Sequence, residues 1–284
     1  MPNRIPAIFL NDGHTLPQFG LGTWQIPDED VAAVLQSAFA MGYRAIDTAA
    51  AYENERGVGE GIRRSDLPRQ SLAITTKLAN DCHGYDTALR AFDASLARLG
   101  LDYVDLYLIH WPLPMHDLYV ETWKALIEIK NQGRARSIGV SNFNVEHIER
   151  LLDETGTVPA VNQIELHPRF QQKALRNFHA DHGIATESWS PLGRATFLQD
   201  PVLGSLVRKH GKSPAQIILR WHLDNGLIVI PKSVNAGRLR ENIDVLDFKL
   251  DGDDMSKIAG MDRADGRTGP DPLTFGELLR RCGN

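Results

Sequence analysis

Residues 72–112 read LAITTKLANDCHGYDTALRAFDASLARLGLDYVDLYLIHWP. Residues 72–78 and 104–110 are almost continuously apolar and rich in β-branched or aromatic side chains, which is typical of parallel strands buried on both faces. Residues 87–100 between them have the periodicity of a helix and end on Gly100. The stretch therefore predicts a strand–helix–strand unit with parallel strands.

The same alternation continues in both directions from this unit. Further strands are expected at residues 19–24, 44–49, 135–142, 159–166, 184–190 and 227–233, and further helices at 28–42, 55–65, 119–133, 144–156, 172–183, 213–226 and 236–246. A longer insert separates residues 190 and 213. At the start of the chain, residues 5–10 and 14–19 flank Asn11-Asp12-Gly13, which suits the tight turn of a β-hairpin.

Eight strand–helix units in 284 residues predict a (β/α)8 TIM barrel with an N-terminal β-hairpin, formed by residues 1–284 as a single domain. A doubly wound sheet is the alternative, and its dinucleotide-binding form carries a G-x-G-x-x-G turn directly after the first strand. Gly57, Gly59 and Gly61 have a different spacing and no preceding strand, so we interpret them as glycines of a loop and an early helix.

Polar residues end seven of the eight expected strands. Because the C-terminal ends of barrel strands meet at one mouth, which carries the active site in this fold, these residues should converge. They are Asp47, Lys77, His110, Ser141 with Asn142, Gln163 with Glu165, Trp189 with Ser190, and Lys232 with Ser233.

Three of these strand ends and one loop residue predict an acid catalyst. A buried Lys77 needs a carboxylate partner, and Asp47 on the neighbouring strand is the natural one. Tyr52 lies just past Asp47 and can lean over this pair, where the ammonium should lower the pKa of its phenol. His110 on the next strand could orient a carbonyl or share the proton.

Composition narrows the classes of partner. The net charge is −5, which gives no electrostatic case for nucleic acid or an anionic membrane as a partner. No apolar run reaches the length of a membrane span, and the N-terminus lacks a signal-peptide core. Cys82 and Cys282 are expected to be thiols in a reducing, cytoplasmic compartment. No metal site is expected, and we interpret His179 and His182 as solvated helix histidines.

A set of segments carries a family resemblance. They are LGTWQ, YRAIDTAAAYENE, TTKL, DLYLIHWP, RSIGVSNF, NQIELHP, SPLG, IPKS and RLRENIDVLDFKL, in this order. In them the chain resembles the aldo-keto reductase superfamily over nearly its whole length. The resemblance implies a monomeric, NADPH-dependent reductase of small carbonyl compounds. Tyr52 would be the general acid, tuned by Lys77 and Asp47, and His110 would position the carbonyl.

The resemblance also implies the residues that contact NADPH or NADP+. Trp189 would stack on the nicotinamide, while Lys232, Ser233 and Arg238 would surround the 2′-phosphate. Asn235 stands where close relatives often have arginine, which should weaken the grip on that phosphate and the preference for NADPH over NADH. The full set is Thr23, Trp24, Ser141, Asn142, Gln163, Trp189, Ser190, Leu192, Gly193, Lys232, Ser233, Val234, Arg238, Glu241 and Asn242.

The substrate side is less defined. Trp24, His110 and Trp111 resemble the walls of the family's pocket, and Arg267 could meet a substrate carboxylate or be a surface residue. The segment ESWSPLG is similar to that of bacterial 2,5-diketo-D-gluconate reductases, which implies diketo sugar acids or methylglyoxal-like dicarbonyls as substrates. The alternative function is a regulatory barrel that senses the nicotinamide cofactor with slow turnover.

Overall fold

The computed structural model describes residues 5–276, and its strands form two sheets. β1 (Ala7–Phe9) and β2 (Thr15–Pro17) pair as an antiparallel hairpin, with Gly13 of the turn at a φ of 87°. The second sheet has eight strands, all parallel. They are β3 (Leu21–Gly22), β4 (Ala45–Asp47), β5 (Ala73–Leu78), β6 (Val104–Ile109), β7 (Ala135–Ser141), β8 (Val161–Glu165), β9 (Ala185–Trp189) and β10 (Ile228–Val229).

The large sheet closes between its first and last strands. Phe19, just before β3, pairs in parallel with Val229 of β10. The N–H of Gly20 donates to Val229 O at 2.9 Å, and the N–H of Val229 donates to Gln18 O at 3.0 Å. The predicted (β/α)8 barrel and its N-terminal hairpin are therefore confirmed.

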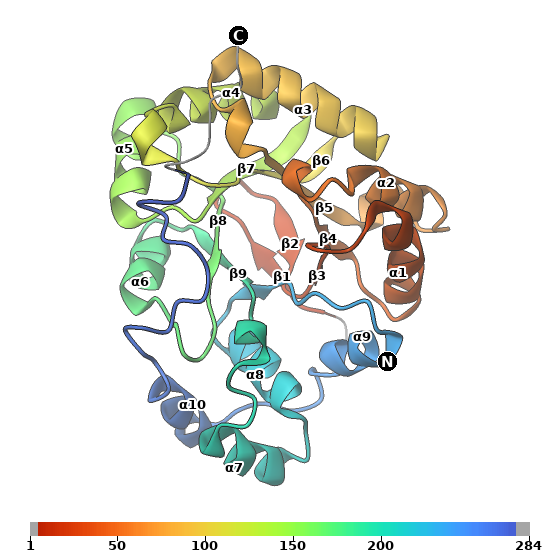
Figure 1. Ribbon diagram of the computed structural model, residues 1–284, viewed down its shortest axis with the longest axis vertical. Coiled ribbons are helices and arrows are strands. Elements are labelled where there is room, and N and C mark those ends of the chain that lie inside the picture. Colours follow the sequence, from red (N-terminus) through yellow and green to blue (C-terminus); the bar gives the residue numbers. More distant parts are fainter. Residues whose placement is uncertain (1–4, 277–284) are drawn as a thin grey trace.

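Ten α-helices of the described chain lie around the barrel, with α7 and α10 further out than α8 (Figure 1). None of the helices between residues 5 and 276 is both long and apolar enough to cross a membrane. The helices are α1 (Asp28–Ala40), α2 (Glu55–Arg63), α3 (Tyr85–Leu99), α4 (Tyr119–Asn131), α5 (Val145–Thr155), α6 (Lys173–Asp181), α7 (Pro201–His210), α8 (Pro214–Asp224), α9 (Ala236–Ile243) and α10 (Gly252–Ala259).

Two of these helices, α7 and α10, lie outside the eight predicted repeats. α7 fills the insert after β9, and its first turn is capped by Asp200, whose carboxylate accepts from the N–H of Val202. α10 follows the helix that was expected to be the last, and it starts with a capping box between Asp251 and Asp254. Lys209 of α7 pairs with both of these carboxylates, at 2.6 and 2.7 Å, so the two extra helices hold each other.

The glycines after Tyr52, which were interpreted as part of a loop and an early helix, all lie within α2 and serve helix packing. A Cβ on Gly57 would lie 2.1 Å from the carbonyl oxygen of Asp28, and one on Gly59 would lie 2.1 Å from that of Leu99. Their absence of a side chain allows α2 to approach α1 and α3 closely. Cys82 is a half-buried thiol, and Cys282 lies outside the described residues.

The barrel interior is apolar below and polar above. The lower layer includes Leu10 and Leu16 of the hairpin together with Leu106, Leu108 and Ile228 of the strands. The hairpin thus closes the bottom of the barrel, while a separate and larger core lies between strands and helices. Polar side chains at the upper strand ends are consequently sealed from water from below, which strengthens electrostatic interactions among them.

Candidate active site

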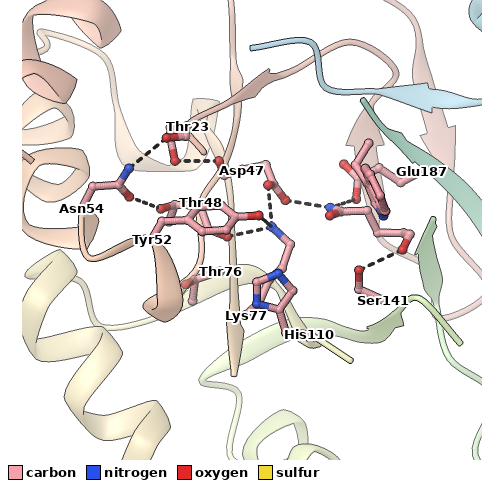
Figure 2. A network of polar contacts seen from close by, with 12 residues as sticks. Thr23, Asp47, Thr48, Tyr52, Asn54, Thr76, Lys77, His110, Ser141 and Glu187 are labelled. Atoms are coloured by element: carbon pink, nitrogen blue, oxygen red, sulfur yellow. Dashed lines mark hydrogen bonds and ion pairs between the residues drawn. The ribbon is translucent and has the colours of Figure 1, made fainter. Parts of the chain in front are cut away.

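The four residues predicted to form a cluster do meet at the barrel mouth (Figure 2). Lys77 Nζ lies 2.5 Å from Asp47 Oδ1, 2.9 Å from Thr48 O and 3.4 Å from Tyr52 Oη. The rings of Tyr52 and His110 meet edge to face, with centroids 5.6 Å apart. We call Asp47, Tyr52, Lys77 and His110 the strand-end cluster.

A buried asparagine that sequence reasoning missed positions the loop of Tyr52. Asn54 donates from its amide to Thr23 O and to Ile26 O, both at 2.9 Å. Its carbonyl oxygen accepts from the hydroxyl of Thr48 at 2.7 Å. The loop between β4 and α2 is thereby tied to the end of β3, which places the phenol above Lys77. Only its position before a predicted helix, as a possible cap, distinguished Asn54 in the sequence.

Lys77 is a fully buried ammonium whose charge is compensated by Asp47. Burial acts to lower the pKa of Lys77, but the Asp47 carboxylate and the adjacent Tyr52 outweigh it, so the pKa is raised. Lys77 therefore stays positively charged at neutral pH.

The predicted direction of the Tyr52 pKa was wrong. Burial of the hydroxyl raises the pKa of Tyr52 above its ordinary value, although the charge of Lys77 acts to lower it. The sequence argument considered the ammonium but not the loss of water around the phenol, nor the opposing carboxylates of Asp47 and Glu187. Tyr52 is consequently protonated at rest, which is the form a proton donor needs.

His110 is neutral. Burial, and then the charge of Lys77, lower the pKa of His110 to about 3. Its Nδ1 is buried and has no hydrogen-bond partner within residues 5–276. Of the two roles predicted for His110, a neutral ring can orient a carbonyl oxygen by donating a hydrogen bond, whereas sharing a proton as imidazolium does not fit this pKa.

A second carboxyl group, Glu187 of β9, lies beside the cluster and was not predicted. It is 3% exposed, and the amide of Gln163 donates both to Glu187 Oε2 at 2.9 Å and to Asp47 Oδ2 at 2.8 Å. Burial, and then Asp47, raise the pKa of Glu187 to about 7. The signal was present in the sequence, because a charged residue two positions before Trp189 in a buried strand must share its inward face.

The residues expected around a nicotinamide form a hydrogen-bonded group at the ends of β7 to β9. Ser141 donates to Gln163 O at 2.8 Å, and Asn142 donates from its amide to His110 O at 3.0 Å. The indole N–H of Trp189 donates to Asn142 Oδ1 at 2.8 Å, which fixes the plane of the ring. Since the Gln163 amide N–H groups are engaged by two carboxylates, its carbonyl oxygen is the atom left for a ligand.

The residues expected around phosphates lie at the ends of β9 and β10. Ser190 and Gly193 adopt left-handed backbone conformations, with φ of 47° and 53°, in the turn that also contains Leu192. Lys232 and Arg238 are exposed, and neither has an ion-pair partner among the described residues.

The segment around Asn235 begins α9. The side chain of Asn235 accepts from Arg238 N at 3.0 Å, so this residue is the N-cap of the helix. Thr23 is buried and donates its hydroxyl to Asp47 O at 3.0 Å, whereas Val234 is exposed. Glu241 is half-buried and Asn242 is buried.

Residues 263–276, here called the C-terminal strap, lie against the mouth. Glu165 at the end of β8 accepts from the N–H and hydroxyl of Thr268, at 2.7 and 2.6 Å, and from the N–H of Gly269 at 2.9 Å. A Cβ on Gly269 would lie 2.4 Å from the ring of Trp189, so the strap passes directly over that indole. Glu165 therefore fixes the strap at the rim.

The predicted pocket walls have different environments. Trp111 is buried, and Phe275 of the strap packs on it with ring centroids 4.2 Å apart. Trp24 is 44% exposed, with the guanidinium of Arg194 at 5.8 Å from its ring centroid. The guanidinium of Arg267 lies 4.8 Å from the ring centroid of Phe170, outside the strand-end cluster.

The interpretation of His179 as a solvated residue was wrong. Its ring is buried and contacts the amide of Asn162 at 2.9 Å and the hydroxyl of Thr186 at 2.8 Å. It therefore joins α6 to the outward faces of β8 and β9. His182 is exposed and stacks on Phe178, with ring centroids 4.1 Å apart.

Comparison with known proteins gives consistent matches. Residues 16–263 match the aldo/keto reductase family. An aldo-keto reductase of Mycolicibacterium smegmatis is 55% identical, and methylglyoxal reductase DkgA of Escherichia coli strain K12 is 53% identical; each alignment covers 95% of this chain and 98% of the relative. The crystal structure of a Gox0644 variant in complex with NADPH superposes with a TM-score of 0.92 at 55% identity, covering 95% of this chain and 98% of the other.

Proposed function

The chain belongs to the aldo/keto reductase family, and from this premise we propose that it reduces aldehydes and ketones to alcohols with NADPH, with Tyr52 as the proton donor. As a family member it is an NADP-dependent oxidoreductase. The roles of individual residues below belong to the proposal.

The mouth fits an NADP cofactor. The indole plane of Trp189 and the carbonyl oxygen of Gln163 suit a nicotinamide with its carboxamide, together with Ser141 and Asn142. The turn of Ser190, Leu192 and Gly193 would face the pyrophosphate. Two cations without an ion-pair partner in the described chain, Lys232 and Arg238, stand beside Ser233 at the start of α9, where a phosphate dianion is favoured. Thr23, Trp24, Val234, Glu241 and Asn242 would complete the contacts.

When bound, the nicotinamide supplies a hydride to the carbonyl carbon. The residues of the chain manage the proton and the charge. As negative charge develops on the carbonyl oxygen, the Tyr52 O–H bond breaks and the O–H bond of the alcohol forms. The phenolate left behind lies beside the Lys77 ammonium, 3.4 Å away, which stabilises it. Neutral His110 donates a hydrogen bond to the same oxygen and orients it.

The observation that carries this proposal is the chain of contacts from Asp47 through Lys77 to Tyr52. A buried ion pair is costly unless well compensated, and this one is aimed at a single phenol at the mouth. A barrel that only sensed its cofactor would have no need of it, so the arrangement favours turnover over the sensing alternative.

The proposed substrates are small dicarbonyl compounds. Support comes from the relative named methylglyoxal reductase DkgA and from the shortness of the segment 111–119 after β6, which suits a mouth without a long covering loop. Methylglyoxal and 2,5-diketo sugar acids are therefore the first compounds to assay.

The test is NADPH consumption by wild type, Tyr52→Phe and the matched control Tyr85→Phe, which alters a surface phenol on α3. Loss of the proton donor should reduce the rate by about 10²- to 10⁴-fold with cofactor affinity retained, while the control should behave as wild type. Near-normal turnover by Tyr52→Phe would contradict the mechanism. Absence of turnover by wild type across the carbonyl panel would contradict the function.

A further inference from the structure

Glu187 is a buried carboxyl group to which the proposed reaction assigns no role. It projects from β9 to the same interior layer as Asp47 and is bridged to it by one amide group, that of Gln163 (Figure 2). Both oxygens that accept from this amide belong to carboxyl groups less than 4% exposed. The negative charges of two carboxyl groups would therefore have to be stabilised by one amide, that of Gln163, and one ammonium, that of Lys77.

Water does little to screen this group. Asp47 and Glu187 line a small cavity of about 10 Å³ together with the apolar side chains of Leu16, Ile228 and Ile230. Such a volume holds one water molecule at most. The state of the Glu187 carboxyl is therefore set by its protein neighbours.

The charged and titratable neighbours of Glu187 come from three elements. Asp47 on β4 disfavours its ionisation, Lys77 on β5 favours it, and Tyr52 in the loop after β4 senses its charge. The adjacent strands present Gln163 from β8 and Ile228 from β10, and neither side chain titrates. Asp47 and Lys77 form an ion pair at 2.5 Å, so a negative charge on Glu187 would be the one left without its own cation in this group.

We propose that Glu187 is a positioning residue of the reductase, which holds the Gln163 amide toward Asp47 and whose ionisation makes Tyr52 a weaker proton donor. The proposal rests on the proposed function, since it concerns the acid strength of Tyr52 in that reaction. It adds a pH-dependent control that operates inside the barrel, through the Gln163 amide that joins Glu187 to Asp47.

The sign of the control follows from charge. Below the Glu187 pKa of about 7 its carboxyl is neutral, and the group formed with Asp47 and Lys77 has no net charge. Above it, Glu187 adds a negative charge, which raises the pKa of Tyr52 and disfavours the phenolate formed when the proton leaves. Reduction should therefore slow as pH rises through about 7.

The effect on the rate should be modest, because Glu187 acts on Tyr52 without touching it and the proton is only partly transferred in the transition state. A roughly threefold change in rate is expected.

The experiment measures the single-turnover rate of methylglyoxal reduction from pH 5.5 to 8.5, by stopped-flow NADPH fluorescence, in wild type and Glu187→Gln. The variant is isosteric and keeps an oxygen that can accept from Gln163. Glu55→Gln is the matched control, because Glu55 is an equally buried carboxylate bonded to Thr76 and Arg98 on the helix side of the barrel. Wild type and control should slow roughly threefold across pH 7, while Glu187→Gln should keep the faster rate throughout.

An unchanged pH step in Glu187→Gln, or a flat profile in wild type, would overturn the role of Glu187. A wild type that binds NADPH but turns over no carbonyl compound would instead overturn the proposed function. If Glu187→Gln does not fold, wild-type protein labelled with ¹³C at glutamate carboxyls decides the matter. A buried carboxyl resonance titrating near pH 7 supports the proposal, and absence of such a resonance refutes it.

Discussion

Replacing Lys77 by Met should destabilise the fold by an amount set by the charge it leaves behind. Lys77 is 0% exposed and its ammonium donates to Asp47 at 2.5 Å and to Thr48 O at 2.9 Å. Met fills a similar volume, so little packing is lost. Asp47, 3% exposed, would keep only the Gln163 amide as a donor from those contacts. Removing one partner of a buried pair typically costs about 3–5 kcal/mol, because the remaining charge is left buried.

The partner variant separates this cost from any packing effect. Asp47→Asn combined with Lys77→Met removes both charges, and the amide oxygen at position 47 can still accept from Gln163. The double variant should recover at least about 2 kcal/mol relative to Lys77→Met alone, since replacing a whole buried pair is often nearly neutral.

Urea denaturation at pH 8, followed by tryptophan fluorescence, measures the free energy of unfolding of all four proteins of this cycle. Asp47→Asn alone should be destabilised too, because it leaves the ammonium without its counter-ion. The reasoning is refuted if Lys77→Met loses less than about 1 kcal/mol, or if the double variant is as unstable as the sum of the two single variants.

Two further predictions concern the rim. Glu165→Ala removes the acceptor of three hydrogen bonds from the C-terminal strap. The KM for the carbonyl substrate should rise about tenfold, and protease cleavage within residues 263–276 should accelerate. Thr268→Val removes one of the three hydrogen bonds and should have a smaller effect. Unchanged KM and cleavage in Glu165→Ala would contradict the anchoring role. Asn235→Arg adds a cation near the proposed phosphate site but removes the N-cap of α9, so the ratio of NADPH to NADH affinity should rise about tenfold while stability falls by about 1 kcal/mol. Fluorescence titration with each cofactor and urea denaturation measure the two effects, and an unchanged affinity ratio would count against that phosphate site.

Periodicity was sufficient to predict the barrel. The barrel strands are buried on both faces and appear as apolar runs, and the helices between them are amphipathic. This alternation of apolar runs and helical periods can be recognised in the sequence without knowledge of the tertiary structure. α7 and α10 were missed although their capping residues, Asp200 and Asp251, are visible in the sequence. Lys209 of α7 pairs with Asp251 and Asp254 at the start of α10, which is a contact between distant segments that no local pattern reports.

The sequence predicted where the residues of the strand-end cluster lie, but it did not predict the direction in which the pKa of Tyr52 shifts. Strand ends converge by topology, so Asp47, Lys77 and His110 could be placed together before any coordinates. The direction in which the pKa of Tyr52 shifts depends on how much water reaches its hydroxyl. The loop held by Asn54 and the apolar layer below the cluster determine this access of water. The predicted cofactor contact of Gln163 is narrowed to its carbonyl oxygen, because its amide N–H groups donate to two carboxyl groups on different strands, which the sequence does not report.

The directions of the four shifts favour one interpretation of the mouth. Lys77 is held charged, His110 is held neutral and Tyr52 is held protonated. In each case the surroundings shift the pKa further from pH 7. Glu187 is the exception, because burial brings its pKa from an acidic value to about 7. Glu187 shares the Gln163 amide with Asp47, which is the partner of Lys77. On our proposal, proton donation by Tyr52 therefore responds to pH through a carboxyl group that lies inside the barrel.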